Sequence, residues 1–126
     1  MTGLWILILL LLLPMPLLMI IFGVMFMNQP PEHIGGAFGY RTRRSMLNID
    51  TWIFAHRYFG RLWLIVGAAL IPATIIAMLP FIGSGEDQIM NAYLVITIVH
   101  VIAMLLPIGF TECALKRNFD ELGRRK

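Results

Sequence analysis

The sequence is poor in charged residues and in cysteine. Only 13% of its 126 residues are charged, whereas average soluble domains are nearer ~25%. Cys113 is the single cysteine, so an internal disulfide framework is excluded. Hydrophobic residues make up 59% of the chain, which excludes intrinsic disorder because disordered chains are poor in them. With a mean hydropathy of +0.80, the composition predicts a small membrane protein.

Three segments without Asp, Glu, Lys or Arg predict membrane spans. They cover residues 4–27, 62–82 and 89–110. A spanning helix needs roughly 20 apolar residues, and backbone groups in lipid must pair within their own segment. We therefore expect an all-α membrane protein in which residues 1–126 form a single domain of three transmembrane helices. Pro14 and Pro16 predict a kink in the first helix, which we expect to be retained because it lacks the flanks of a signal peptide.

The basic residues gather in two parts of the chain. Five lie between the first and second spans and five follow the third: Arg41, Arg43, Arg44, Arg57 and Arg61, then Lys116, Arg117, Arg124, Arg125 and Lys126. The remaining link holds only Glu86 and Asp87 as charged residues. Because cytoplasmic loops carry the excess of Lys and Arg, we expect the N-terminus outside and the C-terminus in the cytoplasm. Basic residues placed in this way favour contact with the lipid bilayer over binding to nucleic acid.

The cytoplasmic loop between the first two spans holds the densest group of candidate binding residues. They are Gly39, Tyr40, Arg41, Thr42, Ser45, Asn48, Trp52 and His56. Gly35 and Gly36 predict turns ahead of them. Asn48 is a strong N-cap, so we expect an interfacial helix to begin there and to continue into the second span.

Two interpretations of residues 39–52 are open. In the structural one, the loop folds under the bundle, the Arg41 guanidinium binds carbonyl groups at helix ends, and Trp52 anchors the chain at the headgroups. In the functional one, the same residues form a recognition surface for a peptide or for a cytoplasmic protein.

His100 lies near the centre of the third span, on one face with Thr97. An ionisable side chain at this depth is a site hypothesis by default. One interpretation is a neutral imidazole that is hydrogen-bonded to Thr74 or to a carbonyl group of the second span. The other is a small transporter or channel-like subunit that uses this face.

Small residues on the second span predict close helix packing. Ala69, Ala73 and Ala77 follow one another at steps of four, a spacing that lets another helix approach. We expect this stripe to pack inside the bundle, and the alternative is the seam of a homo-oligomer.

The tail after the third span has the features of a helix in the cytoplasm. Glu112, a further candidate binding residue, begins a series of acidic residues placed four positions before basic ones. Gly123 is suited to be the C-cap. Leu115, Phe119 and Leu122 form an apolar stripe, which either covers the interfacial helix or lies in the headgroups.

No catalytic arrangement is visible in the sequence. It lacks a nucleophile elbow, a phosphate loop and a zinc-protease motif, so we expect no enzyme, no cofactor and no metal site. Glu112 and His56 form an acid–base pair only if the fold brings them together. An accessory protein of a larger membrane complex is a further alternative.

Parts of the sequence resemble the SdpI/YfhL family of bacterial membrane proteins. Gly-Tyr-Arg-Thr at 39–42, Ser-Met-Leu-Asn at 45–48 and Thr-Trp at 51–52 are similar to its signature, and residues 107–126 are similar to its closing stretch. The resemblance implies a multi-pass protein of the bacterial cell membrane that gives immunity or resistance to a membrane-active peptide toxin. It also implies signalling, in which the protein holds a cytoplasmic regulator at the membrane.

Overall fold

The computed structural model describes residues 2–30, 34 and 39–126. Its helices are α1 (Thr2–Leu12), α2 (Pro14–Asn28), α3 (Ile49–Met78), the short 3-10 helix η1 (Leu79–Phe81) and α4 (Glu86–Asn118). Within the described residues, three stretches are long and apolar enough to cross a membrane: Gly3–Asn28, Ile49–Phe81 and Glu86–Asn118. The predicted all-α fold with three spans is therefore confirmed. Gly35 and Gly36, where we expected turns, lie outside the described residues.

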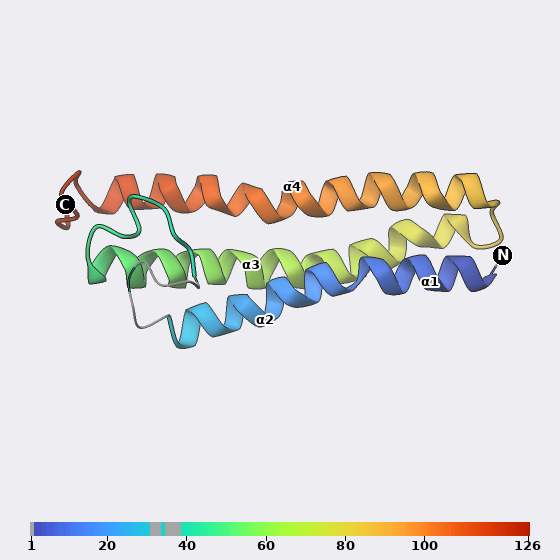
Figure 1. Ribbon diagram of the computed structural model, residues 1–126, viewed down its shortest axis with the longest axis horizontal. Coiled ribbons are helices and arrows are strands. Elements are labelled where there is room, and N and C mark those ends of the chain that lie inside the picture. Colours follow the sequence, from blue (N-terminus) through green and yellow to red (C-terminus); the bar gives the residue numbers. More distant parts are fainter. Residues whose placement is uncertain (1, 31–33, 35–38) are drawn as a thin grey trace.

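The helices form three rods that lie side by side (Figure 1). α1 and α2 follow one another as one bent rod, α3 runs back along it, and α4 is antiparallel to α3. The N-terminus and the turn between η1 and α4 lie at one end, which we call the turn-side end. The loop of residues 39–48 and the C-terminus lie at the other, which we call the loop-side end. The two basic stretches of the chain therefore share the loop-side end.

The bend between α1 and α2 comes from two prolines. The helices meet at Leu13, and Pro14 and Pro16 have no N–H to give to a carbonyl one turn earlier. Helical bonds persist on both sides, since the Leu13 amide donates to Leu9 and the Leu17 amide donates to Leu13, both at 3.2 Å. The chain therefore bends without leaving the path of a helix, and the predicted kink is present.

Glycines let α2 approach α3 closely. A Cβ atom added to Gly23 would lie 2.6 Å from the carbonyl oxygen of Gly60, and one added to Gly67 would lie 2.8 Å from that of Pro16. Distances this short are essentially never seen for real Cβ atoms. The two backbones are thus in direct contact, as is typical of small residues between transmembrane helices.

The alanine stripe of α3 does not form the contact with α2. Ala69, Ala73 and Ala77 are all exposed, so the expectation that they pack inside the bundle is wrong. Gly60 and Gly67 lie two helical turns apart and permit a closer approach than alanine does, and α2 packs on their face of α3.

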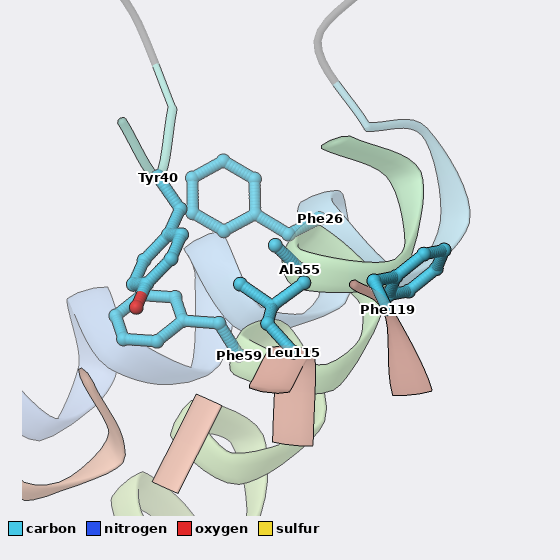
Figure 2. Packing of buried hydrophobic residues seen from close by; sticks show 6 residues of the cluster. All are labelled: Phe26, Tyr40, Ala55, Phe59, Leu115 and Phe119. Carbon is cyan, nitrogen blue, oxygen red and sulfur yellow. The ribbon is translucent and has the colours of Figure 1, made fainter. Parts of the chain in front are cut away.

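Two apolar clusters hold the rods together, one at each end. The turn-side core consists of Ile8, Leu12, Met78, Ile89 and Ala92. The loop-side core, shown in Figure 2, consists of Phe26, Tyr40, Ala55, Phe59, Leu115 and Phe119. The loop-side core takes side chains from α2, the loop, α3, α4 and the tail, so it fixes all of these elements relative to one another.

The tail is helical only as far as Asn118. We expected the helix to continue to about Leu122, and this part of the expectation is wrong. The Asp120 carboxylate accepts the backbone N–H groups of Leu122 and Arg124, both at 2.9 Å, and such local bonds compete with the helix. Gly123, with a φ of 82°, then turns the chain back.

The apolar stripe of the tail packs against α3. Leu115 and Phe119 are buried in the loop-side core, and the Phe119 ring lies 5.4 Å from the Phe54 ring, centroid to centroid. Leu122 is 69% exposed and takes no part. Of the two placements that the sequence left open, the structure has the one in which the stripe covers the start of α3.

Candidate functional site

A capping box fixes the start of α3 at the predicted N-cap. The Asn48 Oδ1 atom accepts the Thr51 backbone N–H at 2.9 Å, and the Thr51 Oγ1 atom accepts the Asn48 N–H at 3.0 Å. The Asn48 side chain also donates to the carbonyl oxygen of Gly123 at 2.6 Å. One residue therefore ends the loop, begins α3 and holds the returning tail.

Ser45 closes the loop into a turn. Its side chain is completely buried, and its Oγ atom accepts the Thr42 backbone N–H at 2.9 Å. The same atom lies 2.9 Å from the carbonyl oxygens of both Tyr40 and Thr42. The Thr51 hydroxyl in turn donates to the carbonyl oxygen of Ser45 at 3.0 Å. The backbone of residues 40–48 is thereby tied to the first turn of α3.

His56 joins the loop to α3 and is a neutral imidazole. Its Nε2 atom accepts the Tyr40 backbone N–H at 2.7 Å, and its Nδ1 atom lies 2.8 Å from the carbonyl oxygen of Trp52. A backbone N–H can only donate and a carbonyl can only accept, so the proton must be on Nδ1. The buried ring also lies 4.2 Å from the Trp52 ring and 5.1 Å from the Phe26 ring, centroid to centroid.

Tyr40 connects the loop to α4. Gly39, with a φ of 124°, precedes it, and the Tyr40 ring packs on Phe59 at 4.7 Å between centroids. Its hydroxyl donates to the carbonyl oxygen of Ile108 at 3.2 Å. Burial, and then the negative charge of Glu112, raises the pKa of the Tyr40 hydroxyl far above its ordinary value. The hydroxyl therefore remains a donor at every physiological pH.

Glu112 and His56 do not form an acid–base pair. Both ring nitrogens of His56 are occupied by backbone groups, which leaves none for the carboxylate. The Glu112 Oε2 atom is buried and has no hydrogen-bond partner among the described residues. Among the described residues, no group of three His, Cys, Asp or Glu side chains is arranged to hold a metal ion.

Arg41 points away from the network that holds the loop. It is exposed and makes no hydrogen bond or ion pair with the described residues, so the expectation that it binds carbonyl groups at helix ends is wrong. Trp52 is completely buried within the protein, and its placement at the headgroup level stays a prediction.

An apolar groove lies beside Arg41 and reaches from the loop to α2 and α4. It has a volume of about 460 Å³ and is lined by Phe22, Phe26, Gly39, Tyr40, Arg41, Thr42, Phe59, Trp63 and Ile108. Sequence reasoning missed Phe22, Phe26 and Ile108, because an apolar residue inside a span carries no signal that it faces a groove.

In the middle of the bundle, the structure brings together two of the three polar residues singled out there. The Thr74 Oγ1 atom lies 2.8 Å from the His100 Nε2 atom, and both side chains are buried. Thr97 is half-buried and has no side-chain hydrogen bond to any residue that the structure describes. The Trp63 indole donates to the carbonyl oxygen of Met104 at 3.1 Å, a second polar link between α3 and α4 that the sequence did not reveal.

Comparisons with known proteins give two matches. A family model described as the SdpI/YfhL protein family matches residues 33–111. A protein of Bacillus subtilis (strain 168) described as "Uncharacterized protein YfhL" is 42% identical over 53 residues, which are 42% of this chain and 48% of that protein. The match thus spans about half the length of this curated relative. No solved structure gives a significant match.

Proposed function

The chain belongs to the SdpI/YfhL protein family, and from this premise we propose that it protects its cell by binding a membrane-active peptide toxin. The observation that carries the proposal is the exposed Arg41 at the edge of the apolar groove. The family membership supports a role in the membrane, and the apolar groove beside an arginine supports a ligand that has both apolar and acidic groups.

The lining of the groove suits a peptide that enters membranes. Four aromatic rings from α2 and α3, namely Phe22, Phe26, Phe59 and Trp63, offer apolar contact. Arg41 adds a planar fork of donors that fits a carboxylate, either an acidic side chain or a free C-terminus. A membrane-active peptide carries both kinds of group, with apolar side chains for the groove and a carboxylate for the guanidinium.

Buried hydrogen bonds hold the loop in place in the absence of a ligand. Ser45 and His56 hold the backbone on either side of Arg41 through buried hydrogen bonds. A binding surface that is already ordered loses little conformational entropy when its ligand arrives. A recognition surface requires such an arrangement, in which buried residues hold the loop and Arg41 has no hydrogen bond or ion pair among the described residues.

The same groove offers a path for signalling. Tyr40 lines it and is bonded both to His56 on α3 and to the Ile108 carbonyl group on α4. A peptide that displaces Tyr40 would disturb the loop-side core, to which the tail is attached through Phe119. On the expected topology the tail is cytoplasmic. A cytoplasmic regulator would then detect the bound toxin through the changed position of the tail.

The transporter alternative has less support. Thr74 and His100 bond to one another between α3 and α4, so each already has a polar partner in lipid. This arrangement favours a structural role for the pair.

A resistance assay tests the proposal. The gene is deleted, and the strain is complemented with the wild-type chain, with Arg41→Ala or with Arg43→Ala. Arg43 is the matched control, since it is an exposed arginine of the same loop that does not line the groove. The probe is the membrane-active peptide fraction of stationary-phase medium from the parent bacterium.

We expect deletion to sensitise the cells, and wild-type and Arg43→Ala chains to restore resistance. Arg41→Ala should accumulate in the membrane normally, but the same resistance should require about ten to a hundred times more protein, because a hydrogen bond to a charged group contributes about 1.5–3 kcal/mol. Unchanged resistance after deletion, or full rescue by Arg41→Ala, would contradict the proposal.

A further inference from the structure

A second groove lies at the loop-side end, along the first turns of α3. It has a volume of about 630 Å³ and is lined by Met27, Asp50, Ile53, Phe54, Arg57, Tyr58, Arg61 and Arg125. It shares no lining residue with the groove beside Arg41. Pockets of this size are typical of small-molecule sites.

Three arginines line this groove. Arg57 and Arg61 are exposed and lie one turn apart on α3, a spacing at which like charges repel. Arg125 adds a third positive charge from the tail, against a single carboxylate from Asp50. Within the described part of the chain, the only ion pair joins Arg124 to Asp120. The three arginines of the groove therefore have no protein anion as a partner there.

The fold of the tail brings Arg125 to this position. The Lys126 backbone N–H donates to the Asn118 carbonyl oxygen at 2.9 Å, which closes the turn. The Arg125 guanidinium carbon then lies 6.0 Å from the centre of the Phe54 ring and 5.3 Å from that of Phe119, distances at which a cation is attracted to an aromatic face. Tertiary structure thus brings Arg125 to two arginines that lie 64 and 68 positions earlier in the sequence.

The predicted spans put this groove at the boundary between polar headgroups and hydrocarbon. Arg61 directly precedes the uncharged stretch that begins at residue 62. One turn further along α3, Ile65 continues the face of Arg61 and is 56% exposed. An amphiphile with a negative head could therefore place its head among the arginines and its chain along the exposed face of α3.

We infer that this groove binds an anionic phospholipid, with its phosphate among Arg57, Arg61 and Arg125. Guanidinium groups match phosphate geometry with paired donors. Phe54 and Ile53 cover the glycerol side, and the exposed face beyond Arg61 takes an acyl chain. The inference is independent of toxin binding, because it concerns another face of α3.

Native mass spectrometry of the full chain in detergent tests the inference. The probes are phosphatidylglycerol, phosphatidylcholine, inorganic phosphate and poly-glutamate, each at the same concentration. The groove variant carries Arg57→Gln, Arg61→Gln and Arg125→Gln together. The matched control carries Arg43→Gln, Arg44→Gln and Arg117→Gln, which remove the same charge outside the groove. Circular dichroism checks that both variants remain helical.

We expect the wild-type chain to retain phosphatidylglycerol and to discriminate against phosphatidylcholine. Each basic residue near an anionic membrane strengthens binding about fivefold, so the groove variant should lose well over tenfold while the control stays near wild type. Arg125→Gln alone, a change at an exposed tail residue, should lose about fivefold even if the triple variant does not fold.

Three results would overturn the inference. An equal loss in the control variant would mean that overall charge, and not the groove, retains the lipid. Displacement of the lipid by inorganic phosphate at equal concentration would assign the groove to a free anion. Displacement by an equal concentration of poly-glutamate would assign it to an acidic protein segment.

Discussion

Replacing Gly60 with alanine tests whether direct backbone contact holds α2 against α3. The new Cβ atom would lie 2.7 Å from the Gly23 carbonyl oxygen, 2.9 Å from the Phe26 Cβ atom and 3.2 Å from the Met27 nitrogen. Two of these three are backbone atoms of α2, which cannot move unless the helix does. Overpacking typically costs about 1–3 kcal/mol, and the rigid neighbours put this site at the upper end of that range.

The higher helix propensity of alanine partly offsets this cost. Alanine favours a helix over glycine by about 1 kcal/mol, so the net destabilisation by Gly60→Ala should be about 2 kcal/mol. Gly109→Ala is the matched control, because Gly109 lies within α4 and an added Cβ atom meets nothing within 4 Å. The control keeps the helix gain and should be neutral or up to about 1 kcal/mol more stable.

Reversible unfolding in mixed detergent micelles measures this difference. Sodium dodecyl sulfate is titrated against the folded protein, and far-ultraviolet circular dichroism and tryptophan fluorescence follow the transition. The two variants should differ by about 2–3 kcal/mol in the free energy of unfolding. If they agree within about 0.5 kcal/mol, the backbones are not in contact at Gly60 and the packing of α2 described above is incorrect.

Two further predictions concern the ends of the bundle. The first is tested with the native cysteine replaced and a new cysteine placed at Ser84 or at Lys126. The cysteine at Ser84 should react with an impermeant thiol reagent in whole cells and the one at Lys126 should not, because all ten basic residues lie outside the turn that holds Ser84. The reverse labelling pattern would show that the expected topology is inverted. The Arg124 backbone N–H, ahead of other contacts, holds the pKa of Asp120 below its ordinary value of 3.8, so the tail turn should be intact above about pH 4 and open as the pH falls through the lowered pKa. Amide NMR signals of the tail should follow this titration in the wild-type chain, and an Asp120→Asn chain in which the same pH dependence persists would refute it.

The spans and the helix start could be predicted because their causes are local. Bilayer thickness sets the length of an apolar helix, and any sequence that spans must satisfy it. Asn48 caps α3 through Thr51, three residues away, so the signal and its structural effect lie within one turn. Thr74 is one of the two hydrogen-bond partners that the sequence predicts for His100, since a polar side chain in lipid needs a partner at its own depth.

The features that could not be predicted depend on tertiary register. Both Ala69 and Gly60 are small residues suited to helix packing, and the choice between their faces depends on where the bent α1–α2 rod crosses α3. The return of the tail depends on the Asn48 side chain, which bonds to Gly123 across 75 positions in the sequence. No periodicity within residues 111–126 contains that information.

The loop shows why its two interpretations were hard to separate in the sequence. The Ser45 and His56 side chains are buried, and among the described residues they bond to backbone groups alone, so their chemistry serves the shape of the loop. Arg41 sits between the backbone groups that they hold, and it has no bond of its own among the described residues. The structural and the functional interpretation therefore each apply to different residues of the loop under the proposed function, and burial is what distinguishes them. Mutations at the buried positions should therefore impair folding, whereas under the proposed function a mutation of Arg41 should impair binding and leave the fold intact.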